Sequence, residues 1–163
     1  MKKNIAIFGG SLFEDIKNVE GNYIPTSMQA VIKLAKEYNI DNYSLGGMQI
    51  ERAKRLIQLL PMKELYSDCI LALGEADLDN PLEFEASLRQ IIDHLQEQHI
   101  RPLLVSLPKE LMNDSKAIFI QNIIDKIAVE KNVDYIYEGQ TSKLVSYVVL
   151  EEADYFNAIL YLC

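Results

Sequence analysis

The sequence is poor in the residues that build disulfide-linked, membrane-spanning or nucleic-acid-binding proteins. Of its 163 residues only two are cysteine, and Cys69 and Cys163 lie too far apart to form a disulfide framework or a metal-ligand motif. No apolar run approaches the length that crosses a bilayer, and the first residues turn polar too early for a secretory signal. A net charge of -8 disfavours nucleic acid, because phosphate binding needs a basic surface. We therefore expect no membrane and no nucleic-acid partner, and a cytoplasmic location.

Short apolar runs alternate with stretches of helical periodicity, which is typical of α/β proteins. The expected strands are 5–8, 42–45, 69–73, 103–107 and 135–137. The expected helices are 27–38, 50–60, 83–98 and 115–131. In the tail, 145–150 could add a strand, and 155–162 could be a strand or a short helix. Because the strands are apolar on both faces, we expect one domain, 1–163, that is a three-layer α/β/α sandwich with a mainly parallel, five-stranded sheet of flavodoxin-like type.

Three of the first four expected strands run directly into glycine. The residues that follow them are Gly9-Gly10-Ser11, Gly46-Gly47-Met48 and Gly74-Glu75-Ala76-Asp77. In open parallel sheets, ligands bind outside the carboxyl ends of the strands, and glycine lets a backbone approach a ligand closely. The sequence therefore predicts a functional site at this edge of the sheet.

The first of these loops lacks the patterns that bind nucleotide phosphates. Neither G-x-G-x-x-G nor G-x-x-x-x-G-K-[ST] occurs in it. The opening run KKNIAIFGGS resembles the start of the nicotinate-mononucleotide adenylyltransferases, but the H-x-G-H motif of that family is missing, since no histidine precedes His94. No cofactor is expected.

Four short motifs resemble, in the same order along the chain, the four blocks of the SGNH (GDSL) hydrolases. Ile7–Leu12 is similar to the G-D-S-L block, with Gly10 in place of the aspartate, and Tyr43–Gly47 resembles the second block. Gly74–Leu78 is similar to the G-x-N-D-L block, with alanine in place of the asparagine. Asp154–Asn157 resembles the D-x-x-H block, with asparagine in place of the histidine. The resemblance implies an SGNH-hydrolase-like fold and hydrolysis of an acyl or carbohydrate ester.

The resemblance also implies a role for each residue of the site. Ser11 would attack the ester carbonyl, Asp154 would orient the base, and the Gly47 amide would bind the oxyanion. The residues expected to line the oxyanion and substrate-binding region are Gly10, Gly47, Glu75, Ala76, Asp77 and Asn157. Ala76 has no side-chain donor, and Asn157 cannot act as a base at neutral pH.

The chain offers two other sources of a base. His94 and His99 are expected near the amino end of the fourth strand, opposite Ser11, and are therefore interpreted as structural. Carboxylates follow the first and third strands, and they could act as a base, hold Mg²⁺, or simply cap the helices that follow. They are Glu14, Asp15, Glu75 and Asp77. Because acidic residues are abundant in this chain, capping is favoured, and no metal site is predicted.

Two functions from different classes therefore remain. The first is a divergent ester hydrolase with Ser11 as nucleophile and an unconventional base, which the intact serine favours. The second is a non-catalytic relative that keeps the pocket to bind a small ester or sugar, or to contact a partner, which Ala76 and Asn157 favour. Weak or absent esterase activity is the expectation, and the oligomeric state is not predicted.

Overall fold

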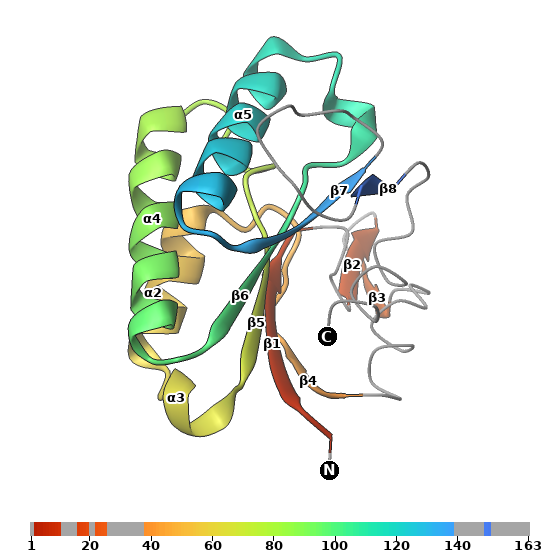
Figure 1. Ribbon diagram of the computed structural model, residues 1–163. Coiled ribbons are helices and arrows are strands. Elements are labelled where there is room, and N and C mark those ends of the chain that lie inside the picture. Colours follow the sequence, from red (N-terminus) through yellow and green to blue (C-terminus); the bar gives the residue numbers. More distant parts are fainter. Residues whose placement is uncertain (1, 11–15, 20–21, 26–37, 139–148, 151–163) are drawn as a thin grey trace.

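The computed structural model describes residues 2–10, 16–19, 22–25, 38–138 and 149–150, and the description below is confined to them (Figure 1). A six-stranded sheet has the order β4-β1-β5-β6-β7-β8, and every neighbouring pair is parallel. Its strands are β1 (Asn4–Gly9), β4 (Asn39–Asn42), β5 (Asp68–Ala72), β6 (Arg101–Val105), β7 (Asp134–Glu138) and β8 (Val149–Leu150). The short strands β2 (Ile16–Val19) and β3 (Asn22–Pro25) pair antiparallel with each other.

The helices lie between the sheet strands in the chain, as in other α/β proteins. They are α2 (Ile50–Leu59), α3 (Met62–Leu65), α4 (Pro81–Glu97) and α5 (Ser115–Glu130), with a 3-10 turn, η1 (Lys109–Leu111). Figure 1 shows α2, α4 and α5 together on one side of the sheet. Two helix starts have clear local causes: Pro81 occupies the first turn of α4, and the Asp114 carboxylate accepts the N–H groups of Lys116 and Ala117 at the start of α5.

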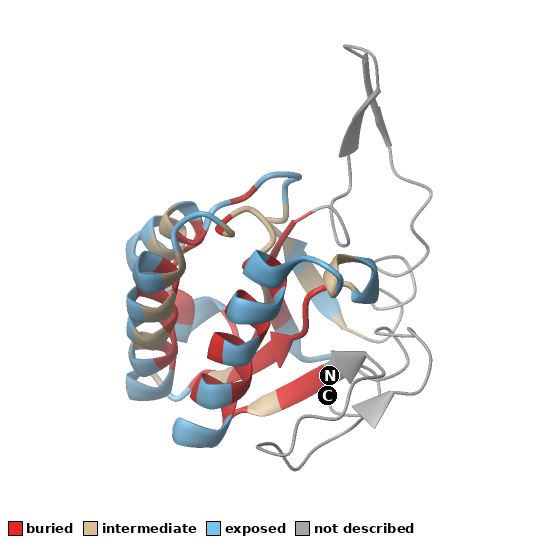
Figure 2. Ribbon diagram, turned by 90° about the horizontal axis from the view of Figure 1, so that it is seen from above, coloured by how far each residue is buried: buried red, intermediate tan, exposed pale blue. Residues whose placement is uncertain are grey.

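The core lies between the sheet and these helices. Alternate strand residues point into it, among them Phe8, Cys69, Leu71 and Tyr135, and Figure 2 shows the buried helix residues turned toward the strands. The strand residues of opposite parity are also buried without belonging to this cluster: Ile5, Ile7, Ile70, Leu103, Val105 and Ile136. A parallel sheet buried on both faces is what the continuous apolar strands predicted. Among the described helices, none is long and apolar enough to span a bilayer.

The predicted fold class, a parallel α/β sheet covered by helices, is confirmed, and β8 adds a sixth strand beside β7 to the five expected. The strand expected at 42–45 begins earlier, as β4, whose Asn-Ile-Asp-Asn sequence is too polar to stand out as a strand. The chain nevertheless stays beside β1 after β4, because the N–H groups of Tyr43 and Leu45 donate to the carbonyls of Ile7 and Gly9. β8 falls within the strand suggested for 145–150, whereas the β2–β3 pair was not predicted. The helix expected at 27–38, apart from its last residue, and the element at 155–162 lie outside the described residues.

Two glycines at the carboxyl edge of the sheet are required for different reasons. Gly74, which follows β5, has φ +118°, and a Cβ there would lie 2.9 Å from Ile120 Cγ2 and 3.2 Å from Phe84 Cζ. Gly47 has φ +78°, but a Cβ there would meet nothing within 4 Å. Position 74 therefore requires glycine both for its left-handed backbone conformation and because a side chain would not fit. Position 47 requires glycine only for its backbone conformation.

This difference predicts unequal costs for the same substitution. Gly47→Ala should lower the free energy of unfolding by about 1 kcal/mol, the cost of a left-handed alanine. Gly74→Ala should lower it by about 3 kcal/mol or more, because a strained backbone and a steric clash add. Urea unfolding of the two variants beside the parent protein measures both values. Equal losses would contradict the packing assigned to Gly74.

Candidate functional site

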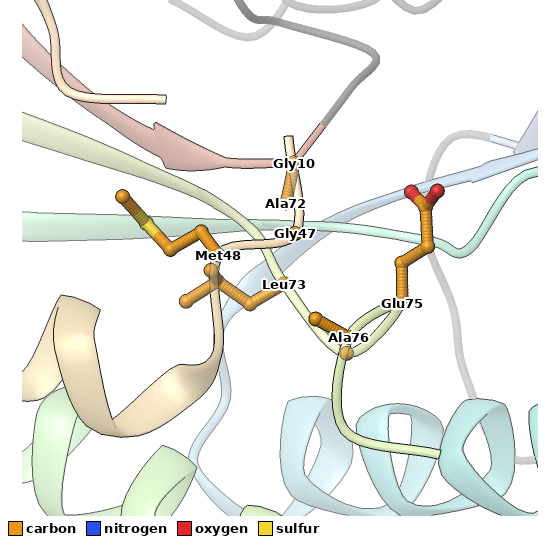
Figure 3. A pocket seen from close by; sticks show the side chains of 8 residues that line it. Gly10, Gly47, Met48, Ala72, Leu73, Glu75 and Ala76 are labelled. Atoms are coloured by element: carbon orange, nitrogen blue, oxygen red, sulfur yellow. The ribbon is translucent and has the colours of Figure 1, made fainter. Parts of the chain in front are cut away.

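The site predicted at the carboxyl edge of the sheet coincides with a cavity. Gly10 follows β1, Gly47 follows the segment that extends β4, and the loop Gly74–Ala76 follows β5; all three reach the cavity (Figure 3). Its volume is about 130 Å³, and Met48, Ala72 and Leu73 complete the lining. The parallel pairing of β1 with β4 and with β5 brings these exits together.

The residues assigned to the site by sequence have different outcomes. Gly10, Gly47, Glu75 and Ala76 line the cavity together. Asp77 is the next residue in the same loop, but it is not among the lining residues. Ser11, Asp154 and Asn157 lie outside the described residues, so their assigned roles remain predictions.

Glu75 brings a carboxylate against the exit of β1. A Cβ placed on Gly10 would lie 3.4 Å from Glu75 Oε2, which is ordinary van der Waals contact, so the carboxylate lies close to the Gly10 backbone. In Figure 3 the Glu75 side chain rises from the loop after β5 to the level of Gly10, while the Ala76 methyl group lies at the cavity wall. Among the described residues that line the cavity, only Glu75 has an ionisable side chain.

Gly47 belongs to a tight turn that starts helix α2. The Met48 N–H donates to the Leu45 carbonyl at 3.0 Å, and the positive φ of Gly47 suits the third position of a type II turn. Gly47 is exposed, whereas Met48, which follows it, is buried in the core. The buried Met48 side chain thus fixes the turn in the core, while the Gly47 backbone stays accessible at the cavity.

Asp77 connects this turn to the loop after β5. Its Oδ2 and Oδ1 atoms lie 3.0 and 3.3 Å from the backbone nitrogen of Ile50, the first residue of α2, whose N–H they accept. The residue before α2, Gln49, makes no side-chain cap, so Asp77 caps this helix from a neighbouring loop. The sequence predicts a capping role for Asp77 only toward a following helix, whereas the observed contact joins positions 27 residues apart.

Burial governs the acidity of Asp77. Only 5% of the residue is exposed, and this desolvation raises its pKa to about 6. The hydrogen bond from Ile50 opposes the rise, and the negative charges of Glu83 and Glu51 add to it. Asp77 is therefore a buried carboxylate that ionises close to neutral pH.

Ser44 is a polar residue of this region to which sequence analysis gave no role. Its buried hydroxyl has no hydrogen-bond partner within the described part of the chain. It lies beside β1, since a Cβ on Gly9 would be 3.4 Å from Ser44 Oγ. Ser44 belongs to the second motif, Tyr43–Gly47, and its place in that motif is the feature of the sequence that could have identified it.

Neither histidine is near the cavity. His94 lies in the last turn of α4, where its Nε2 is 2.8 Å from Gln98 Nε2, and His99 occupies the turn that leads into β6. Both positions are at the amino end of β6, opposite the cavity, as the sequence predicted. No group of three histidine, cysteine or acidic side chains in the described ranges could hold a metal ion.

No protein-family model matches the chain, and a search of curated proteins finds no match. Solved structures do match. A lipolytic protein of the G-D-S-L family from Desulfitobacterium hafniense shares 18% identity and a TM-score of 0.65, over 82% of this chain and 76% of that one. AlinE4, an SGNH-hydrolase family esterase, shares 22% identity and a TM-score of 0.60, over 83% and 75%. The acetyl xylan esterase AlAXEase shares 24% identity and a TM-score of 0.62, over 81% and 75%.

Identities this low establish the fold and leave the chemistry to be argued from the site. The matches cover most of both chains, and they bear out the fold that the resemblance to the SGNH hydrolases implied. The protein therefore has an α/β fold of the SGNH-hydrolase type.

Proposed function

We propose that the protein is a serine ester hydrolase, formed by one SGNH-hydrolase-like domain over 1–163, with Ser11 as nucleophile and the Gly47 amide as an oxyanion donor. The convergence of Gly10 and Gly47 on one cavity carries the proposal, because Ser11 is bonded to Gly10. The esterase and lipolytic descriptions of proteins with the same fold support it. Asp154 keeps the role of an orienting acid within this proposal.

The cavity suits a small acyl group. A volume of about 130 Å³ holds roughly four water-sized groups. Met48, Leu73 and Ala76 give it apolar walls, which suit an acetyl methyl better than a charged group. We therefore place short-chain esters, including acetylated carbohydrates, first among the substrates.

The reaction follows the usual course of serine acyl transfer. A base removes the Ser11 proton, Oγ attacks the carbonyl carbon, and the carbonyl π electrons move to oxygen. The Gly47 N–H stabilises this oxyanion, while Ala76 supplies no side-chain donor. Loss of one such donor typically lowers the rate about 10²- to 10³-fold, so slow turnover is expected.

The first prediction concerns the acyl chain length of the substrate and the identity of the nucleophile. The parent protein should hydrolyse p-nitrophenyl acetate at least about tenfold faster, in kcat/KM, than the octanoate ester, since the longer chain exceeds the cavity. Ser11→Ala should reduce both rates to the buffer background. Steady-state kinetics with both esters measures this. Activity that survives Ser11→Ala would refute Ser11 as nucleophile.

A second prediction tests the missing oxyanion donor. Ala76→Asn should raise kcat about tenfold to a hundredfold, because its amide can donate to the oxyanion. Leucine has the same branched shape as asparagine but no hydrogen-bond donor, so Ala76→Leu should not raise kcat. Comparing kcat for the two variants separates hydrogen bonding from packing. A gain with leucine, or none with asparagine, would count against this geometry.

A non-catalytic binding protein is the second candidate, and the Ala76 methyl group at the cavity wall favours it. In that case the parent protein and Ala76→Asn would both lack turnover. An acetylated sugar would instead shift the amide NMR signals of Gly10 and Gly47 without being consumed.

The ionisation of Asp77 makes the stability of the folded protein depend on pH. The folded protein binds the Asp77 proton more tightly than the unfolded chain, since the pKa rises from its ordinary 3.8 to about 6. The stabilising contribution of this group is therefore fully present below pH 3.8 and is lost as the pH rises through about 6.

Asp77→Asn cannot ionise but keeps an oxygen that can accept the Ile50 N–H. Its free energy of unfolding, relative to that of the parent protein, should increase by on the order of 2 kcal/mol between pH values of about 4 and 7. Urea unfolding of both proteins across this range provides the measurement. Stability profiles that run parallel would show that Asp77 does not titrate as described.

A further inference from the structure

We propose that a groove between the starts of α4 and α5 is a carbohydrate subsite, which holds the sugar ring of a substrate whose acetyl group occupies the cavity. The groove has a volume of about 340 Å³ and is lined by Leu78, Asp79, Pro81, Ser115, Lys116 and Phe119. None of these residues is among those that line the cavity. The inference rests on the proposed function for the acetyl group, whereas binding of the sugar ring is tested without it.

The groove lies at the same edge of the sheet as the cavity. Helices α4 and α5 follow strands β5 and β6, so both helices begin at the carboxyl edge (Figure 1). One loop contributes to both hollows, because Gly74–Ala76 line the cavity while Leu78 and Asp79 line the groove. Adjacent α-carbons are about 3.8 Å apart, so those of Ala76 and Leu78 are separated by no more than about 7 Å. One acetylated sugar residue can span such a separation.

The apolar wall of the groove suits the carbon–hydrogen face of a sugar ring. Phe119 is 52% exposed, so about half of this large aromatic residue is accessible to solvent beside the groove. Leu78 and Pro81 supply apolar surface from the loop after β5 and the first turn of α4. The face of an aromatic ring carries negative charge density, which attracts the weakly positive C–H groups of a pyranose. A sugar stacked on Phe119 would also remove apolar surface from water.

The polar wall of the groove offers partners for sugar hydroxyl groups. Lys116 Nζ lies 2.5 Å from Asp79 Oδ1, and Ser115 adds a hydroxyl group. A carboxylate accepts hydrogen bonds, an ammonium group donates them, and a hydroxyl group does both, so adjacent sugar hydroxyls find partners of both kinds. The Asp79 and Lys116 side chains are largely exposed, and a ligand that replaces their water with hydroxyl groups leaves them solvated.

The two walls of the groove are held in place by the packing of α4 against α5. Arg89 Nε of α4 lies 2.7 Å from Glu130 Oε2 of α5, and Lys126 Nζ of α5 lies 2.8 Å from Glu85 Oε1 of α4. These contacts fix the spacing of the helices along their length. A preorganised groove loses little conformational entropy when it binds a ligand.

Two other classes of ligand suit the groove less well. A fatty acyl chain would place hydrocarbon against the Asp79–Lys116 pair, and charged groups lose free energy when water is replaced in this way. A phosphate group would meet the Asp79 carboxylate in a chain of net charge -8, and like charges repel. A neutral ring with an apolar face and several hydroxyl groups avoids both costs.

The first part of the test measures binding and does not depend on catalysis. Methyl β-D-xylopyranoside and methyl β-D-glucopyranoside, titrated into the isotopically labelled protein, should shift the backbone amide NMR signals of Leu78 and Phe119. Benzyl alcohol, an apolar ring of similar size with a single hydroxyl group, should bind more weakly than the pyranosides.

Matched variants assign the binding to the groove. Phe119→Ala and Asp79→Asn should each raise Kd about threefold to tenfold, because one removes the stacking surface and the other a charged hydrogen-bond acceptor. Val129→Ala shortens a half-exposed side chain at the other end of α5, and Asp93→Asn breaks the ion pair with Lys131 between the far ends of the same helices. Neither of these two controls should change Kd.

The second part of the test connects the groove to the proposed hydrolysis. Phe119→Ala should lower kcat/KM about threefold to tenfold for the mono-O-acetylated forms of methyl β-D-xylopyranoside, because the sugar ring loses its stacking surface. It should leave kcat/KM for ethyl acetate, which has no sugar ring, unchanged. An equal fall for both esters would show that Phe119 supports the fold and does not contact the sugar, and would overturn the subsite.

The outcomes separate the two proposals. Hydrolysis of ethyl acetate without sugar-induced shifts at Leu78 and Phe119 would overturn the carbohydrate subsite and leave the serine hydrolase standing. Sugar binding at the groove without hydrolysis of any ester would support the subsite and refute the hydrolase. Tighter binding of benzyl alcohol than of either pyranoside would overturn the subsite in favour of an apolar ligand.

Discussion

The parallel pairing of β1 with a neighbour on each side is the constraint on which the site depends. Gly9 is in register with Ala72 of β5, and the Leu45 N–H donates to the Gly9 carbonyl from the other side. Parallel strands end at the same edge of a sheet, so these two pairings bring three loops together. The sheet supplies the geometry, and the loops then need only small residues to leave a cavity at their junction.

Asp77 converts this proximity into a fixed arrangement. Its carboxylate accepts the first N–H of α2, which couples the loop after β5 to the turn that contains Gly47. The arrangement has an electrostatic cost, since burial raises the pKa of Asp77 to about 6 and so disfavours the ionised form near neutral pH. An unsatisfied helix N-terminus at the same place would also be costly, and the positive end of the helix dipole partly compensates the carboxylate.

Much of the architecture could be predicted from local sequence, because buried parallel strands are apolar on both faces and end at glycines. The predicted strand 42–45 starts where β4 ends, because an edge strand needs few apolar residues and the Asn-Ile-Asp-Asn sequence of β4 resembles a loop. The contact between Asp77 and Ile50 and the approach of Glu75 to Gly10 could not be predicted, since each joins residues distant in sequence through side-chain geometry. Motif resemblance pointed to Gly10, Gly47, Glu75 and Ala76, whereas only the structure shows that these four residues line one cavity.

In the proposed hydrolase, the missing side-chain donor at Ala76 would place the stabilisation of the oxyanion on the backbone. The Gly47 N–H belongs to a turn that is closed by the hydrogen bond from Met48 to Leu45, and Met48 is buried in the core. A donor held in this way needs no side-chain ordering when the intermediate forms, whereas the Ala76 methyl group can donate no hydrogen bond. The rate that the protein retains would therefore depend on how well the pairing of β1 with its two neighbours holds the backbone at the cavity.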